Sequence, residues 1–157
     1  MTITVTTPPA VEPVSLKEMM DYLRIDEPTE AKTLLGLISA ARAEVETRTG
    51  RALAAQGLTL TLDKFPRSLI LPLPRPMLDS VTSVKYYDAD GELQTLSSES
   101  YMVDNSGAPG AIYAPNGWPV TQARPGAVQI EYVTQGVCPN PLKVAIQYFV
   151  SLWFQQR

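Results

Sequence analysis

The side chains that most often perform chemistry are scarce in this sequence, and their scarcity excludes several kinds of active site. The 157 residues include no histidine, so a Ser-His-Asp triad, a histidine general base and a histidine metal centre are impossible. The single cysteine, Cys138, cannot form an internal disulfide or a thiolate metal site, and no cationic neighbour in the sequence activates its thiol. A lysine or paired-carboxylate mechanism remains open, but no motif indicates one. We expect no enzyme, no metal site and no cofactor.

Acidic residues gather at Asp88, Asp90 and Glu92, where alternating carboxylates match part of a calcium-binding loop. Leu93 and Leu96 occupy positions where such a loop needs further oxygen ligands, so a β-hairpin turn explains the pattern better. The glycines form neither a G-x-G-x-x-G fingerprint nor a G-x-x-x-x-G-K-S/T loop. No phosphate-binding cradle is therefore predicted.

Basic residues do not cluster into a nucleic-acid interface. Arg42, Arg48 and Arg51 come closest, but Glu44 and Glu46 lie between them, as on a self-paired, solvated helix face. With 13 basic and 16 acidic residues, the formal net charge is −3. Because phosphate contacts by Lys and Arg dominate affinity for DNA, we expect no tight or specific DNA binding. Passing contact with DNA stays open.

The composition indicates one soluble domain. Hydrophobic residues make up 45% of the chain, which is enough for a core, and the 14 prolines argue against an all-helical bundle. The sequence shows no secretory signal and no apolar stretch of about 18 residues that could cross a membrane. We expect a protein made in a reducing cytoplasm.

Hydropathy patterns place two helices in the first third of the chain. Residues 1–13 are polar, contain three prolines and are expected to form an extended arm. Ser15 and Glu18 fit a capping box that starts the first helix of a helical region, 14–50. A break at Asp26-Glu27-Pro28 separates this helix from a second one, which the short connection makes its antiparallel neighbour.

From residue 56 to residue 135 the pattern changes to short strands. Leu58, Leu60 and Leu62 alternate with threonines, which is typical of a strand with one apolar face. Turn-forming residues separate six or seven such segments, which predicts an antiparallel sheet or a small sandwich. Three prolines within residues 72–76 exclude that segment from a central strand.

A last helix is predicted over residues 140–157, with Asn140 as its cap and Pro141 at its first helical position. This helix belongs to a charge-poor half of the chain, residues 105–157. The charged residues of that half are Arg124, Glu131, Lys143 and Arg157. Either these segments form the core, or another protein chain covers part of them, because interface centres are depleted of charge.

Large apolar side chains in the charge-poor half are the candidate protein interface. They are Trp118, Tyr148, Leu152, Trp153 and Phe154. Trp118 lies in a proline-rich loop, where it is either an exposed anchor for a partner or part of a loop folded over the sheet edge. For Trp153 the alternative is packing in the core.

In their order along the chain, these segments resemble the head–tail connector (adaptor) family of tailed bacteriophages and gene transfer agents. The resemblance covers nearly the whole chain from about Val14. The residues that carry it are Val14-Ser15-Leu16, Leu23-Arg24-Ile25, Glu44 to Arg51, Leu73 to Pro76, Ser80 to Asp88, Tyr101 to Asp104, Trp118-Pro119, Val128 to Tyr132 and Pro141 to Ile146.

The resemblance implies a structural, non-enzymatic subunit of a ring of about twelve copies. Such a ring docks beneath the portal protein at the capsid vertex, receives stopper or tail proteins on its far side, and lets DNA pass through its centre without specific binding. It is assembled in the bacterial cytoplasm and resides in the virion. Members often carry a C-terminal extension that reaches the portal, whereas this sequence stops at Arg157.

The predicted fold is α+β in a single domain, residues 1–157. It consists of a small helical bundle (two N-terminal helices plus one C-terminal helix) with an inserted antiparallel β-rich region. The predicted function is that of a head–tail connector. Two alternatives remain, which are another phage head-completion or stopper protein and a non-phage β-rich binding module. A deep apolar pocket would favour the binding module.

Overall fold

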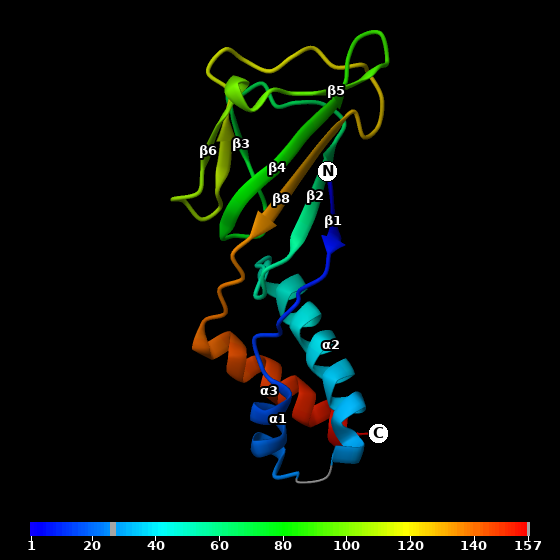
Figure 1. Cartoon of the computed structure of the whole chain (residues 1–157), viewed down its shortest axis with the longest axis vertical. Helices are drawn as coiled ribbons and strands as arrows, with labels where there is room; N and C mark the ends of the chain where they lie inside the picture. The colour runs from blue at the N-terminus through cyan, green and yellow to red at the C-terminus, as the bar shows by residue number, and fades with distance from the viewer. Residues whose placement is uncertain (26–27, 157) are drawn as a thin grey trace.

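The computed structural model describes residues 1–25 and 28–156, and it has the predicted α+β fold. Helices gather at one end of an elongated molecule and strands at the other (Figure 1), and each end has its own hydrophobic core. The elements are β1 (Thr2–Thr7), α1 (Leu16–Leu23), α2 (Ala31–Thr49), β2 (Gly57–Leu62), β3 (Ile70–Pro72), β4 (Leu78–Tyr87), β5 (Leu93–Thr95), β6 (Met102–Asp104), β7 (Ala111–Tyr113), β8 (Val128–Thr134) and α3 (Asn140–Gln155), with short 3-10 turns at Pro28–Glu30 and Ser98–Ser100.

The start of α1 confirms the predicted capping box. The N–H of Glu18 donates to Ser15 Oγ at 3.2 Å, and the N–H of Ser15 donates to Glu18 Oε2 at 2.8 Å. Val14 and Met19, which flank this cap, are both fully buried in the helical core. The helix ends at Arg24, whose backbone is left-handed with a φ of 55°. The predicted break at Asp26-Glu27 lies outside the described residues.

The helical core forms where α2 and α3 pack along one another. Leu34, Ile38 and Val45 of α2 and Ile146 and Val150 of α3 are all buried there. These side chains recur at three- and four-residue intervals, as expected for the buried face of a helix. The N- and C-terminal parts of the chain therefore share one core, and the β-rich region is an insertion between them, as predicted.

The predicted cap of the last helix is wrong by one residue. Helix α3 begins at Asn140 itself, and Pro139 takes the N-cap position with a φ of −61° and a ψ of 146°. The fixed φ of proline suits that extended conformation, and no side chain caps the helix. The described part of α3 ends at Gln155, and Arg157 lies outside the described residues.

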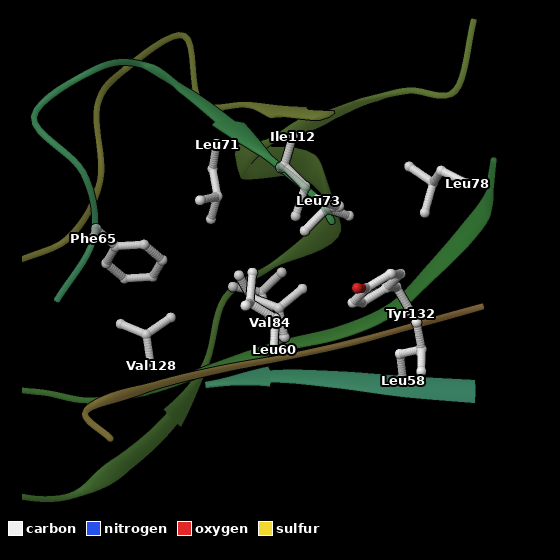
Figure 2. Close-up of a cluster of buried hydrophobic side chains, with 11 residues drawn as sticks. Leu58, Leu60, Phe65, Leu71, Leu73, Leu78, Val84, Ile112, Val128 and Tyr132 are labelled. Carbon is white, nitrogen blue, oxygen red and sulfur yellow. The ribbon is translucent and has the colours of Figure 1, made fainter. Parts of the chain in front are cut away.

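The β-rich end is a small sandwich of two antiparallel sheets. One has the strand order β1-β2-β8-β4-β5 and the other has the order β3-β7-β6. Their facing side chains point toward one another and form the β core (Figure 2). Strand β3, which ends at Pro72, lies at the edge of the smaller sheet, so the prolines of residues 72–76 do stay out of a central position.

The sequence predicts an extended arm over residues 1–13. The first part of this segment is extended in the structure, but it is a strand of the larger sheet. Thr2–Thr7 form strand β1, which pairs antiparallel with β2 and places Ile3 opposite Leu60 and Val5 opposite Leu58. The alternation of threonine with Ile3 and Val5 suits such a strand, because β-branched residues fit a pleated, half-buried surface. The prediction missed this pairing because the partner strand begins some fifty residues later in the sequence.

Three chain segments cross at the waist between the helical end and the β end. At Gly136 the backbone passes so close to its neighbour that a Cβ there would lie 1.9 Å from Ala55 N. Backbone hydrogen bonds join the segments, from Thr134 N to Gln56 O at 3.1 Å and from Gln135 N to Met77 O at 2.9 Å. The waist is therefore held by main-chain contacts in which a larger side chain has no room.

Candidate protein interface

Trp118 lies in the long connection between β7 and β8 and folds back onto the β core. Its indole ring stacks on Phe65, with 4.7 Å between ring centroids and an interplanar angle of 8°. Its Nε1–H donates to the carbonyl of Ser68 at 2.8 Å, and the side chain is half-buried. The structure therefore shows Trp118 in the packing arrangement that the sequence left open, and a further contact with a partner stays a proposal.

Trp153 and Phe154, near the end of α3, pack partly against the helical core. The Trp153 ring lies 5.6 Å from the Phe149 ring, and the guanidinium of Arg48 on α2 lies 5.4 Å from the Phe149 ring centroid. Both residues are half-buried. Phe149 thus contacts both α2, through Arg48, and Trp153, while Trp153 and Phe154 keep part of their surface open.

The opposite side of α3 carries apolar side chains that face away from the core. Tyr148 is 61% exposed and Val144 is 57% exposed. They are four residues apart, so they lie one helical turn apart on the same face, and the half-buried Leu152 continues that face by another turn. We call Val144, Tyr148 and Leu152 the α3 stripe.

The sequence reasoning included Tyr148 and Leu152 but missed Val144. A signal was present, because Val144 precedes Tyr148 by one helical turn. It was overlooked because Val144 is apolar, although Lys143, Gln147 and Ser151 recur every four residues and mark this side of α3 as the polar one. Of the predicted interface residues, Tyr148 and Leu152 lie on the side of α3 that faces away from the core, Trp153 and Phe154 pack partly against the core from the same helix, and Trp118 lies at the other end of the molecule.

The described charges of residues 105–156 are all engaged within the molecule. Glu131 accepts from Lys85 at 3.1 Å, and Lys143 donates to Glu18 on α1 at 2.6 Å. The guanidinium of Arg124 lies 4.0 Å from the Tyr87 ring centroid. Lys143, the charged residue within Asn140–Gln155, is thus paired next to the α3 stripe, which suits a surface that another protein covers.

The ion pair between Glu18 on α1 and Lys143 on α3 lowers the pKa of the Glu18 carboxyl. The hydrogen bond from Lys143, followed by those from the Ser15 backbone and hydroxyl, lowers the pKa of Glu18 to about 2. Burial raises the pKa of the Cys138 thiol, so this thiol is poorly suited to nucleophilic chemistry. The Glu18–Lys143 pair therefore joins α1 to α3.

The described part of the structure contains hollows but no group of metal ligands. Among residues 1–25 and 28–156, no group of acidic residues and cysteine could hold a metal ion. A hollow of about 420 Å³ lies at the waist and one of about 210 Å³ lies beside β1. No helix in these residues is both long and apolar enough to cross a membrane.

Comparison with known proteins finds the same fold in chains of solved gene transfer agent structures. Over its full length, the chain is similar to chains in three solved structures of gene transfer agent (GTA) particles. They are the neck of an empty GTA particle computed with C6 symmetry (TM-score 0.83, 23% identity, 85% of that chain), the virion of a native GTA particle (0.80, 22%, 86%) and the neck of a native GTA particle computed with C12 symmetry (0.79, 22%, 85%). No match is found among curated proteins.

The match to a protein-family model adds evidence from the sequence to the shared fold. Residues 12–157 match the family model of head completion proteins, so the match includes both helical segments and the whole β-rich insertion. The resemblance to the connectors between head and tail, drawn above from the order of segments, is thereby confirmed. A match of this extent shows that the chain belongs to the head completion protein family.

Proposed function

We propose that this chain is a subunit of a head–tail connector ring that docks beneath the portal protein and links the capsid to the tail. The observation that carries the proposal is the match of the entire chain, helices and β sandwich together, to chains found in GTA necks and virions. Membership of the head completion family supports the same function. The subunit acts by binding neighbouring proteins, and the protein resides in the virion after assembly in the bacterial cytoplasm.

A ring of about twelve copies suits this function. The similar necks were computed with C6 and C12 symmetry, which supports a cyclic arrangement of this fold. Twelve copies with a formal charge of −3 each would carry about −36. DNA would then pass through the centre without specific binding, because capture requires clustered Lys and Arg.

The proposed contact surface on the helical end is the α3 stripe, to which the exposed parts of Trp153 and Phe154 on the same helix are added. Exposed apolar side chains on one helix face are typical of helix docking against another protein. The contact partner is a neighbouring copy or the portal. Trp118, at the β end, is proposed to contact the tail or stopper protein through the exposed part of its ring.

The test of the function is the removal of the gene that encodes this chain. We expect capsids that fill with DNA but carry no tails, and restored tails when the wild-type chain is supplied from a plasmid. Cryo-electron microscopy of the restored particles should show the chain directly beneath the portal. Tailed, infectious or transfer-competent particles made without the chain would contradict the proposal.

A stopper protein, the first alternative, would contact different neighbouring proteins from those of a connector. Cross-linking in purified particles should join a connector to the portal, whereas a stopper would be joined only to proteins on the tail side. The alternative of a binding module receives less support. Its expected deep apolar pocket is not found among the described residues, whose hollow at the waist includes Glu12, Gln135, Asn140 and Lys143 in its lining.

A further inference from the structure

Two neighbouring arginines at the waist, Arg51 and Arg75, form no ion pair with any carboxylate of the described residues. Arg75 Nη1 donates to the carbonyl of Arg51 at 3.2 Å, so the two residues lie in contact. Arg42, in contrast, is bonded to both Glu12, at 2.7 Å, and Glu46, at 2.6 Å. We call Arg51 and Arg75 the arginine site. Its charge is available to a carboxylate from outside the subunit.

The backbone fixes the position from which the Arg75 side chain projects. Arg75 has a left-handed φ of 65°, which is uncommon for a residue other than glycine and is disfavoured further by the proline that follows it. The carbonyls on either side are anchored, because Pro74 O accepts from the Tyr132 hydroxyl at 2.8 Å and Pro76 O accepts from Ala52 N at 3.4 Å. Residues in such conformations persist where the surrounding structure holds them, and they gather at functional sites.

The other side of the β end is acidic. Residues 78–113 contain six acidic residues and one basic residue, Lys85, which is already paired. Asp79 on β4 and Asp104 on β6 are exposed, and Asn105, next to Asp104, donates from its Nδ2 to Asp79 O at 3.3 Å. Neither carboxylate forms an ion pair with a basic side chain of the described residues. We call Asp79 and Asp104 the acidic corner.

The acidic corner and the arginine site lie at the same level of the molecule, on opposite sides. Leu78, next to Asp79, pairs with Thr134 in the larger sheet. Thr134 N donates to Gln56 O at 3.1 Å, and Gln56 lines a hollow together with Arg75. Strands β2 and β8 separate β4 from β1, and Figure 1 shows β6 and β1 at opposite sides of the β end. One subunit therefore presents unpaired positive charge on one side and unpaired negative charge on the other.

Apolar surface accompanies the charges on both sides. The hollow beside Arg75 has a volume of about 210 Å³, and its walls include Ile3 and the 57% exposed Val5 of β1. On the other side, Met102 is 63% exposed and lies two positions before Asp104, so both residues are on the same face of β6. Methionine and arginine are enriched in protein interfaces. A contact between the two sides would bury apolar surface around the ion pairs.

We propose that copies of this chain associate head to tail, with the acidic corner of one copy docked against the arginine site of the next. In a cyclic ring each copy presents one side to the copy before it and the opposite side to the copy after it, so two complementary sides of one subunit make every contact. Each copy has a formal charge of −3, so neighbouring copies repel unless opposite charges meet locally. This inference rests on the proposed function, because it names the surfaces that join the subunits of the proposed ring.

The first test reverses the charges of each side and then of both. Arg51→Glu combined with Arg75→Glu should lower the yield of tailed particles on the order of tenfold, because like charges then meet at every contact. Asp79→Arg combined with Asp104→Arg should lower the yield as strongly for the same reason. A chain that carries both pairs of substitutions should regain most of the wild-type yield, because every contact again joins opposite charges.

This restoration separates a neighbouring copy from any other partner. If either site contacted the portal or the tail protein, whose charges stay unchanged, the combined variant would remain at least as impaired as either pair alone. That result would overturn the inference.

Matched controls repeat the same changes of net charge at exposed residues elsewhere. They are Lys17→Glu combined with Lys32→Glu at the helical end, and Asp90→Arg combined with Glu92→Arg in the turn between β4 and β5. Both controls should keep a yield near that of the wild type. An equal loss in the controls would assign the effect to net charge, against the inference. Thermal melting of all purified variants checks that the fold is retained.

The second test identifies the neighbour of the arginine site directly. Arg75→Lys keeps the positive charge and introduces an amine, which a carbodiimide joins to a carboxylate in contact with it. In particles assembled from isotope-labelled and unlabelled copies, mass spectrometry should find this amine joined to Asp79 or Asp104 of a different copy. Cross-links to other proteins alone, or none in particles that contain the chain, would overturn the inference. Absence of the chain from particles would instead contradict the proposed function, so the two failures are distinguishable.

Discussion

Arg42 and Glu46 form a buried ion pair one turn apart on α2, with 2.6 Å between Arg42 Nη1 and Glu46 Oε2. The other carboxylate oxygen, Glu46 Oε1, accepts the backbone N–H of Leu53 at 2.7 Å and the side chain of Gln56 at 3.1 Å. One side chain on the last turns of α2 therefore holds the first residues of the segment that leads into the sandwich. This contact fixes the helical end relative to the β end.

Loss of the Glu46 carboxylate should destabilise the protein strongly. In Glu46→Ala the buried guanidinium of Arg42 and the Leu53 N–H lose a partner, which we expect to cost roughly 3–5 kcal/mol of unfolding free energy. Urea denaturation followed by circular dichroism measures the change. The matched control is Glu44→Ala on the same helix, which breaks an exposed i,i+4 pair with Arg48 and should cost less than about 1 kcal/mol. Similar losses for both variants would contradict the role of the buried pair.

The waist should not tolerate a side chain at Gly136. A Cβ there would lie 1.9 Å from Ala55 N, and the residue has a φ of 70°, so Gly136→Ala should cost roughly 4 kcal/mol or more and give little soluble protein. Gly117→Ala is the control, since Gly117 has a φ of 84° but open space around it. That variant should lose only about 1 kcal/mol, from backbone strain. Comparable soluble yield and melting temperature for the two variants would show that the waist can rearrange.

The contact of Glu18 with Lys143 should make stability depend on acidic pH. Because the folded-state pKa of Glu18 is lowered from 4.5 to about 2, its contribution is present above pH 4.5 and is lost as the pH falls through about 2. The difference in melting temperature between the wild type and Glu18→Gln should therefore shrink across that interval. A difference that is constant from pH 6 to pH 2 would disprove the assignment. NMR titration of the Glu18 carboxyl provides an independent value.

Trp118 should contribute to the stability of the β core. We expect Trp118→Ala to cost about 2 kcal/mol, since it removes the stack on Phe65, while Trp118→Phe keeps an aromatic ring and should cost about 1 kcal/mol for the lost hydrogen bond to Ser68. Guanidinium denaturation measures both. Because Trp153 is the other tryptophan and lies at the helical end, fluorescence of Trp118→Phe reports that end alone. An unchanged midpoint for Trp118→Ala would mean that the ring serves only a partner.

Tyr148 should matter for assembly and not for folding. Its side chain is 61% exposed on the α3 stripe, so Tyr148→Lys should change the unfolding free energy by less than about 0.5 kcal/mol while reducing the number of tailed particles severalfold. Tyr22→Lys is the control, because Tyr22 is an exposed tyrosine on α1, outside the stripe. Particle counts by electron microscopy and melting curves of the purified variants provide the two measurements. Normal particle numbers with Tyr148→Lys would contradict the proposed contact.

Local chemistry explains why much of the fold could be predicted from the sequence. The capping box at Ser15 and Glu18 depends on two residues three apart, and the alternation of Leu58 and Leu60 with threonine depends on neighbours in one strand. The turn at Gly91, which joins β4 to β5, is likewise decided by residues next to one another. Such signals require no knowledge of the rest of the chain. The lack of histidine, the sparse charge of residues 105–157 and the order of the segments were also available from the sequence alone.

Tertiary structure decided which segments meet and which side chains stay uncovered. Pairing of β1 with β2, and of β8 with both β2 and β4, joins residues dozens of positions apart, and a strand pattern carries no information about its partner. Lys143, Gln147 and Ser151 mark a polar side of α3 in the sequence, but the packing of α2 against the helix decided that the apolar Val144 and Tyr148 next to them stay exposed. The bonds from Leu53 N and Gln56 Nε2 to Glu46 Oε1 likewise form only because the segment after α2 folds back against that helix. Local propensities are properties of the residues themselves, whereas exposure and hydrogen-bond satisfaction depend on contacts that form only when distant segments pack.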